Sequence, residues 1–222
     1  MHPQDSCLPQ ESFPEYSTSS QSFWNDRWIL GKTGWDIGYP APAIEEYIRQ
    51  YQNKEASILI PGCGNAYEAA YLVNQGFNNI MLIDIAPEAV KRLQQKFSAH
   101  PEVRIACADF FQHEGSYDLI IEQTFFCAIP PERRMEYAHK AFSLLKNHGK
   151  IAGLLFNRIF GQSGPPFGGS ITEYFPIFNP YFEIKIMEVC YNSIPPRAGT
   201  ELFILLEKNN LTNSISPKLQ QP

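Results

Sequence analysis

Glycine and carboxylate residues follow two apolar segments of this sequence, at places where a ligand could be held. Gly62 and Gly64 come directly after the apolar residues 57–61, and Asp84 is the last residue of the run 79–84. In an open sheet of parallel strands, ligands bind outside the carboxyl ends of the strands, where glycines let the backbone approach a ligand closely. A carboxylate at the end of the second strand can accept hydrogen bonds from both hydroxyls of a ribose. The spacing therefore predicts a nucleoside site.

A second acidic residue extends this prediction. Asp109 and Phe110 follow the short apolar segment 103–106, so we expect their side chains to reach the same cleft. The carboxylate could accept a hydrogen bond from an adenine amino group, with the ring of Phe110 packed beside the base. A dinucleotide fingerprint G-x-G-x-x-G would need glycine where Tyr67 stands. The residues favour an adenosine site, while a nicotinamide site or an ordinary tight turn stays open.

All three tryptophans, Trp24, Trp28 and Trp35, lie close together ahead of these segments. Trp24 and Trp28 are four residues apart, so they share one face if this stretch is helical. Aromatic faces attract a cationic centre by about 0.5–2 kcal/mol per contact, depending on desolvation. We expect a lid whose indoles pack on the sheet, close over a cationic sulfonium cofactor, or do both.

Apolar segments alternate with helical patterns through the middle of the chain. The strands expected there are residues 57–61, 79–84, 103–106, 117–122 and 150–156, and the helices are residues 66–75, 87–98 and 131–146. Pro87 and Pro131 suit the first helical turn, where the missing N–H of proline costs nothing. Unbroken apolar strands separated by helices indicate a mostly parallel sheet that is covered on both faces.

The end of the chain follows a different pattern. Residues 182–191 and 201–207 read as strands joined without a helix, which predicts an antiparallel hairpin at one edge. The sequence thus predicts an α/β fold with a seven-stranded, doubly wound, Rossmann-like sheet, mostly parallel with a terminal antiparallel hairpin. We expect one domain at residues 23–208, with an N-terminal aromatic lid, between polar tails at 1–22 and 209–222.

Composition limits the partners and the compartment. The 222 residues carry a net charge of −5 and no run of lysine or arginine, which argues against nucleic acid. No apolar stretch fits a signal peptide or a membrane span. The five cysteines lack metal-ligand spacing, which indicates reduced thiols and no metal. We expect a cytoplasmic monomer that acts on a small molecule, without a membrane partner.

Several motifs, taken together and in this order, resemble the thiopurine S-methyltransferase family, and most closely its plant-type thiol/halide methyltransferase branch. They are FWNDRW at 23–28, KTGWDIG at 32–38, PGCG at 61–64, FFCAI at 125–129 with PERR at 131–134, and GPPF at 164–167. The resemblance covers roughly residues 22–207. It implies a methyltransferase that uses S-adenosylmethionine and acts on a small soft nucleophile, such as a thiol, a thiopurine, thiocyanate or a halide.

The resemblance also implies roles for individual residues. The cofactor is expected to contact Trp24, Trp28, Trp35, Gly62, Asp84, Asp109, Phe110 and Gln123. The acceptor side is expected to be walled by Trp35, Phe126 and Phe167, although phenylalanines are as often core residues. Arg197 is added to the acceptor side only because it lies in the hairpin turn. There it could attract an anionic acceptor, or it could be a solvated turn residue.

Two positions depart from the family pattern. Gln123 stands where plant-type enzymes usually carry tyrosine and bacterial relatives carry arginine, which affects one expected contact and the choice of substrate. Ala66 stands where the closest relatives usually have glycine. We expect Ala66 to lie at an ordinary helix start, where its methyl group is tolerated, rather than at positive φ.

No catalytic base is expected, because a thiol is already partly ionised at neutral pH and a halide or thiocyanate needs no base. Alignment of the reactants and a dry, apolar pocket would supply the rate. Two alternatives stay open. One is a non-catalytic sensor of S-adenosylmethionine or adenosine, and the other is an NAD-dependent oxidoreductase, because a glycine turn followed by Asp84 also describes that site.

Overall fold

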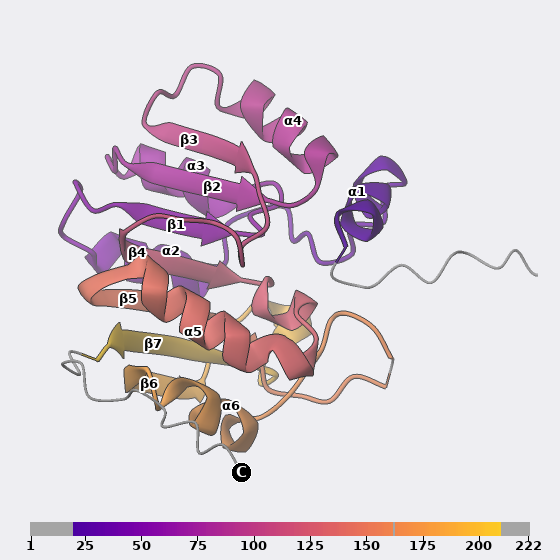
Figure 1. The fold of residues 1–222 in the computed structure, drawn as a ribbon, viewed down its shortest axis with the longest axis vertical. Coiled ribbons are helices and arrows are strands. Elements are labelled where there is room, and N and C mark those ends of the chain that lie inside the picture. The colour runs from indigo at the N-terminus through magenta and orange to yellow at the C-terminus, as the bar shows by residue number, and fades with distance from the viewer. Residues whose placement is uncertain (1–19, 162, 210–222) are drawn as a thin grey trace, which may run out of the picture.

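The structure is a computed structural model that describes residues 20–161 and 163–209, so most of both expected tails lies outside the described residues. Seven strands form one sheet in the order β3-β2-β1-β4-β5-β7-β6 (Figure 1). The strands are β1 Ile58–Pro61, β2 Ile80–Asp84, β3 Val103–Cys107, β4 Tyr117–Gln123, β5 Leu145–Phe156, β6 Phe182–Val189 and β7 Glu201–Lys208. The helices are α1 Gln21–Ile29, α2 Pro42–Gln50, α3 Tyr67–Asn74, α4 Pro87–Lys96, α5 Arg134–Leu144 and α6 Ile171–Phe178.

The predicted doubly wound, Rossmann-like sheet is confirmed. Strands β1 to β5 pair in parallel, while β7 is antiparallel to both β5 and β6. The terminal hairpin therefore lies at one edge, with β6 outermost and β7 between β6 and β5. Its connection contains only the short 3-10 turn Pro195–Arg197.

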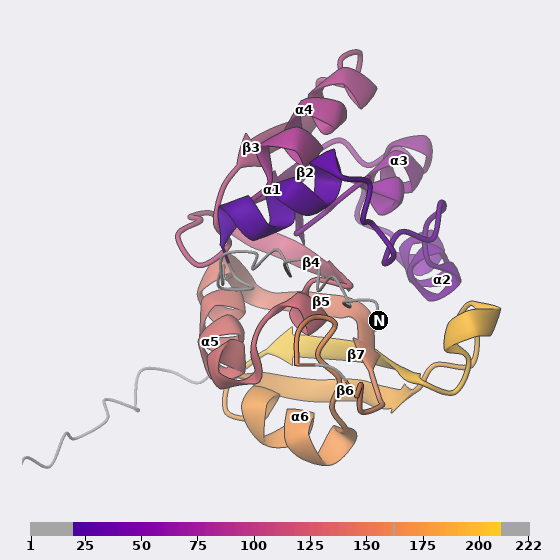
Figure 2. The same ribbon diagram turned by 90° about the vertical axis from the view of Figure 1, so that its right-hand side faces the viewer.

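Each face of the sheet is covered by its own layer of helices. Alternate strand residues point to opposite faces, so Ile58 and Ile60 of β1 join one core and Leu59 joins the other. The first core is completed by apolar residues of α2, α3 and α4, and the second by residues of α5 and α6. Figure 2 views the sheet from its end, with α2 and α3 on one side and α5 on the other.

Helix α1 lies apart from these layers, beside the carboxyl ends of the strands. Ser20 caps it by accepting a hydrogen bond from the backbone N–H of Phe23. Gln21 and Ser22, expected in the polar tail, therefore form its first turn. The arrowheads of β1 and β2 point toward α1 in Figure 1, and α1 crosses in front of β2 in Figure 2. Within the described residues, no helix combines the length and the apolar character that a membrane crossing needs.

Two helices lie where the sequence analysis predicts no element. Helix α2 begins with a proline in its first turn. Helix α6 begins with a capping box, in which Ser170 and Glu173 each accept a hydrogen bond from the other's backbone N–H. Its high apolar content and the internal Pro176 obscure the helical period. The capping signal could have located its start.

The boundary between α5 and β5 also differs from the prediction. The helix was expected to reach residue 146, but it ends at Leu144, because Leu145 already pairs with Tyr117 of β4. Residues 147–149, which lie between the expected helix and the expected strand, belong to β5, where the pairing with β4 shifts register and His148 has φ 60°.

The expectation for Ala66 is wrong. This residue precedes α3 with φ 48° and ψ 53°, in the left-handed region that favours glycine. Its backbone N–H donates to the carbonyl of Cys63 at 2.7 Å, so a tight turn fixes the conformation. The turn that follows β1 therefore imposes positive φ on Gly62, Gly64 and Ala66.

Candidate functional site

A cavity of about 500 Å³ opens at the carboxyl ends of the strands, beneath α1. One half lies against the ends of β1, β2 and β3 and is lined by Gly62, Gly64, Asp84 and Phe110. The other half lies against the ends of β5 and β7 and is lined by Phe156, Arg158, Phe160 and Arg197. The cavity therefore has room for two molecules, or two parts of one, side by side.

The glycine turn brings bare backbone to the first half. Gly62 has φ 53°, and a Cβ added to it would lie 2.3 Å from Cδ2 of Phe125. Such a contact is not possible between real atoms, so the position requires glycine. Gly64 also has φ 53°, and its backbone N–H donates to Oδ2 of Asp84 at 3.1 Å.

Asp84 ends β2 with its carboxylate at the cavity wall, and the residue is 7% exposed. Oδ1 accepts from the backbone N–H of Ala86 at 2.9 Å, and Oδ2 accepts from Gly64. Burial raises the pKa of Asp84, and these two backbone donors oppose the rise. An ionised carboxylate has about four acceptor positions, so Asp84 keeps acceptor capacity on both oxygens. That capacity suits a pair of neighbouring hydroxyl groups.

The three tryptophans meet over the glycine turn, as the lid prediction requires. The rings of Trp24 and Trp35 are 5.5 Å apart and those of Trp28 and Trp35 are 6.0 Å apart, both edge to face. All three line the cavity, and Trp28 is buried at 3% exposure. The indoles therefore pack on one another and present a wall to the ligand, so both expected roles are compatible.

Helix α1 is attached to α4 rather than free. Oδ1 of Asn25 accepts a 2.8 Å hydrogen bond from the backbone N–H of Glu88. The guanidinium of Arg92 lies 5.4 Å from the ring of Trp28 and donates to the Trp28 carbonyl at 3.4 Å. The segment that follows β2 thus positions the indoles as well as Asp84.

The two residues expected beside adenine are placed differently. Phe110 lines the cavity and is stacked on Tyr137, with ring centroids 5.3 Å apart. Asp109 is not among the lining residues, because its Oδ1 accepts from the backbone N–H of Phe111 at 2.9 Å within its own turn. Of the two residues, Phe110 therefore lines the cavity and Asp109 does not.

Gln123 also lies outside the main cavity. It borders a smaller neighbouring hollow with Trp35 and Asn65, where its Oε1 is buried and has no hydrogen-bond partner among the described residues. The next residue, Thr124, turns the chain with φ 59° and lines the cavity instead. The contact expected from Gln123 is therefore absent from the main cavity.

Of the four residues expected on the acceptor side, Trp35 and Arg197 line the cavity. The other two, Phe126 and Phe167, do not. Phe126 is a core residue, 1% exposed, packed on Tyr137 and Phe178 at 5.1 and 5.6 Å. Phe167 is absent from the lining as well, and its backbone N–H donates to the carbonyl of Cys127 at 2.7 Å.

The wall expected from these phenylalanines is formed by others, Phe125, Phe156 and Phe160. Phe156 is the last residue of β5, and its ring lies 5.0 Å from that of Phe160. The rule that ligands gather where parallel strands end could have found Phe156. The sequence could not show that Phe125 rather than Phe126 lines the cavity, because a tight turn decides which of these adjacent residues faces it.

Arg197 is not a solvated turn residue. Its side chain is 13% exposed, and Nη1 lies 3.3 Å from Oε1 of the buried Glu201. Nη2 donates to the carbonyl of Trp35 at 3.0 Å. Arg197 therefore ties the terminal hairpin directly to the tryptophan segment.

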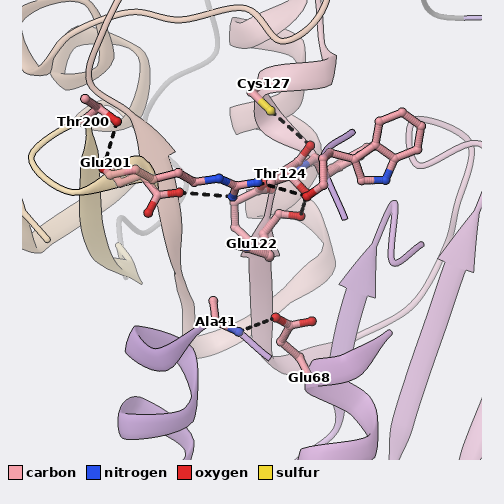
Figure 3. A network of polar contacts seen from close by, with 11 residues as sticks. Ala41, Glu68, Glu122, Thr124, Cys127, Thr200 and Glu201 are labelled. Carbon is pink, nitrogen blue, oxygen red and sulfur yellow. Dashed lines mark hydrogen bonds and ion pairs between the residues drawn. The ribbon is translucent and has the colours of Figure 1, made fainter. Parts of the chain in front are cut away.

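A buried carboxylate that sequence analysis did not select holds the turn after β4. Glu122 is fully buried, and its Oε1 accepts from the backbone N–H groups of Phe125 and Phe126 at 2.9 and 2.7 Å. Its Oε2 accepts from the hydroxyl of Tyr137 at 2.9 Å. Burial raises the pKa of Glu122 to about 7. Figure 3 shows Glu122 beside Thr124 and Cys127. The hydrogen bonds of Glu122 hold the turn whose residues Thr124 and Phe125 line the cavity.

Known proteins are similar to this chain over most of its length. A sequence model described as thiopurine S-methyltransferase (TPMT) matches residues 19–208. A probable thiol methyltransferase 2 of Arabidopsis thaliana is 32% identical over 191 residues, which cover 83% of this chain and 84% of the relative. Thiocyanate methyltransferase 1 of Brassica oleracea is 25% identical over 206 residues, covering 89% of this chain and 90% of the relative.

A solved structure supports the fold. The 1,6-didemethyltoxoflavin-N1-methyltransferase of Burkholderia thailandensis, solved with bound S-adenosylhomocysteine, has a TM-score of 0.69. The two chains are 17% identical, and the match covers 92% of this chain and 94% of that chain. At this identity the similarity concerns the arrangement of strands and helices.

Proposed function

Since this chain belongs to the thiopurine S-methyltransferase family, we propose that its cavity holds S-adenosylmethionine in one half and a sulfur nucleophile in the other. The chain is a methyltransferase of soft nucleophiles that depends on this cofactor. The acceptor we propose is a small thiol or a related anion such as thiocyanate.

The half of the cavity near β1, β2 and β3 has the groups that the nucleoside end of the cofactor needs. Asp84 keeps acceptor capacity on both carboxylate oxygens, which suits the two ribose hydroxyls. Phe110 offers a ring beside the base. Gly62 and Gly64 leave bare backbone next to the bound molecule. We assign these four residues to the cofactor.

The tryptophans are assigned to the sulfonium region. Trp24, Trp28 and Trp35 line the cavity, and an aromatic face attracts a cation by about 0.5–2 kcal/mol per contact. The same indoles, with the phenylalanines of the other half, keep water from the reacting atoms. When bound, the cofactor supplies an activated methyl group to the acceptor.

The remaining residues align the acceptor without a dedicated base. Phe156, Pro165 and Pro166 make an apolar wall that holds an acceptor and excludes water, which favours a reaction that disperses charge. Burial raises the pKa of Cys127 to about 12, so this lining thiol stays protonated and does not compete for the methyl group. Alignment of two bound reactants lowers the barrier by several kcal/mol.

We also infer that the protein is a monomer, resides in the cytoplasm and binds no nucleic acid. The net charge of −5 supports the last point, because a polyanion would be repelled. Light scattering of the purified protein tests the first: a mass twice that of one chain would overturn it.

The proposal depends on one observation about Asp84 at the end of β2. Each of its two carboxylate oxygens accepts one backbone hydrogen bond and can accept another. Calorimetric titration tests it directly: S-adenosylhomocysteine should bind at one site per chain, and NAD should not bind. Labelled S-adenosylmethionine is then offered with a panel of thiols, thiopurines, thiocyanate and iodide. Transfer of the label to at least one of them is expected, and binding without any transfer would indicate a sensor instead.

A further inference from the structure

The wall of the cavity carries an excess of positive charge. Arg27, Lys32, Arg158 and Arg197 line it, against Asp84 as the one acidic lining residue of the described chain. Arg27 and Lys32 come from α1 and the turn after it. The two other arginines, Arg158 and Arg197, border the acceptor half, whereas Asp84 lies in the cofactor half.

The charge of Arg197 is already matched. Its Nη1 lies 3.3 Å from the carboxylate of Glu201, and its Nη2 donates to the carbonyl of Trp35 at 3.0 Å. Glu201 is 3% exposed, so the pair is shielded from solvent. Arg197 thus has its main partners within the fold.

Arg158 differs from Arg197 in this respect. Its guanidinium lies over the ring of Phe160 at 4.8 Å from the centroid, and it has no hydrogen bond or ion pair with another described residue. Its backbone is nevertheless fixed, because its carbonyl accepts from the N–H of Gly169 at 3.0 Å. A Cβ on Gly168 would lie 1.7 Å from that carbonyl, so the loop is closely packed at this point. Arg158 therefore presents an unmatched positive charge from an anchored position.

The two arginines flank a pair of phenylalanine rings. Phe156 and Phe160 meet edge to face at 5.0 Å, with the guanidinium of Arg197 5.4 Å from the Phe156 ring. Arg158 lies on the Phe160 side of this pair. An acceptor with an apolar body could pack on the rings, and a negative group on that body would reach Arg158. A planar guanidinium binds a carboxylate through two parallel hydrogen bonds.

We propose that Arg158 determines specificity, and that it selects a thiol acceptor that carries a carboxylate on an apolar body. This inference rests on the proposed function and names the substrate class for the same cavity. A bare halide or a neutral thiol would leave the charge of Arg158 unmatched. The contact does not enter the methyl transfer itself, so Arg158 acts on binding of the acceptor rather than on the chemical step.

A matched pair of acceptors tests the proposal. The two compounds are 4-mercaptobenzoate and its methyl ester, which carry the same aryl thiol and differ in the charged group. In the unmodified protein, KM should be lower for the acid. The Arg158→Gln variant should raise KM for the acid about 5- to 10-fold, with kcat unchanged and KM for the ester within about twofold. Raising the ionic strength should shrink the preference for the acid, because the charge is exposed.

Two variants serve as controls. Arg158→Lys keeps the charge and should retain most of the preference. Arg49→Gln removes an exposed arginine of α2 that does not line the cavity and should change neither KM. Equal effects of Arg158→Gln on acid and ester, or no effect on either, would overturn the proposal.

A binding measurement separates this inference from the function on which it rests. With S-adenosylhomocysteine bound, the methylated product 4-(methylsulfanyl)benzoate should bind more tightly than its ester, and Arg158→Gln should remove the difference. If S-adenosylhomocysteine binds and thiols are methylated while acid and ester remain equivalent, the proposed function stands and the role of Arg158 falls. If S-adenosylhomocysteine does not bind, both fall.

Discussion

The side chain of Asn25 supplies the N-terminal cap of a helix to which it does not belong. Its Oδ1 accepts a hydrogen bond of 2.8 Å from the backbone N–H of Glu88, in the first turn of α4. The residue at the N-cap position of α4 itself is Ala86, which has no side chain able to accept. The tryptophan-bearing helix and the segment after Asp84 are thereby joined.

Replacing Asn25 with alanine should loosen this attachment. The loss of an N-cap costs about 1 kcal/mol of unfolding free energy. We expect the dissociation constant of S-adenosylhomocysteine to rise several-fold as well, since Trp24 and Trp28 lie on the same helix. Urea unfolding and calorimetry measure the two effects. Asn25→Asp keeps an acceptor at the cap and should restore both, and an unchanged dissociation constant in Asn25→Ala would contradict the link.

Asp84→Asn should weaken binding of the nucleoside. The amide nitrogen cannot accept a hydrogen bond, so one of the two backbone donors or a ribose hydroxyl loses its partner. Hydrogen bonds to a charged group contribute about 1.5–3 kcal/mol, which corresponds to about a 10- to 100-fold rise in the dissociation constant.

The matched control for Asp84 is Asp118→Asn. This change alters a hydrogen-bonded carboxylate that contacts Ser57 and Lys146 outside the cavity. Asp118→Asn should leave the dissociation constant unchanged. Similar dissociation constants for Asp84→Asn and the unmodified protein would exclude the ribose assignment.

Gly62→Ala should be strongly destabilising for two separable reasons. The new Cβ would lie 2.3 Å from Cδ2 of Phe125, and φ of 53° is itself unfavourable for alanine. Phe125 cannot easily move aside, because Glu122 holds its backbone N–H and its ring packs on those of Phe110 and Tyr137. We expect a loss of more than about 2 kcal/mol.

A double-mutant cycle separates these two causes. In a Phe125→Ala background, Gly62→Ala should cost less, because the clash is gone and the backbone strain remains. Chemical denaturation of the four proteins gives the coupling energy. Strictly additive effects would show that the ring does not set the requirement for glycine.

Glu122 should give the stability a distinctive dependence on pH. Its pKa in the folded protein is raised to about 7, above the ordinary value of 4.5, so the folded state binds the proton more tightly than the unfolded state. The contribution of Glu122 to the free energy of unfolding is therefore greatest below pH 4.5. It falls as the pH rises from there to about 7, by at most about 1.4 kcal/mol per pH unit.

Glu122→Gln cannot ionise, so its unfolding free energy relative to the unmodified protein should increase between about pH 5 and about pH 7.5. The difference between the two proteins is the measured quantity, because other buried carboxylates titrate in both. A difference that stays constant across this range would mean that Glu122 does not change protonation there.

The sequence alone determined the sheet and the positions that its strand ends create. Apolar runs separated by helical segments and ended by glycine, aspartate or proline dictate where strands stop. Strands that run parallel bring those stops to one edge. For this reason the cavity half that contains Gly62, Asp84 and Phe110 could be predicted.

Tertiary structure decided the acceptor half and the orientation of side chains after each strand. Whether Phe125 or Phe126 faces the cavity depends on a 3-10 turn that Glu122 holds from the core. Whether Asp109 lines the cavity depends on the hydrogen bond that its side chain accepts from the backbone N–H of Phe111. Positive φ at Ala66 depends on the closure of the turn after β1. Each of these is set by contacts between residues distant in the chain or by turn geometry, and neither leaves a periodic pattern in the sequence.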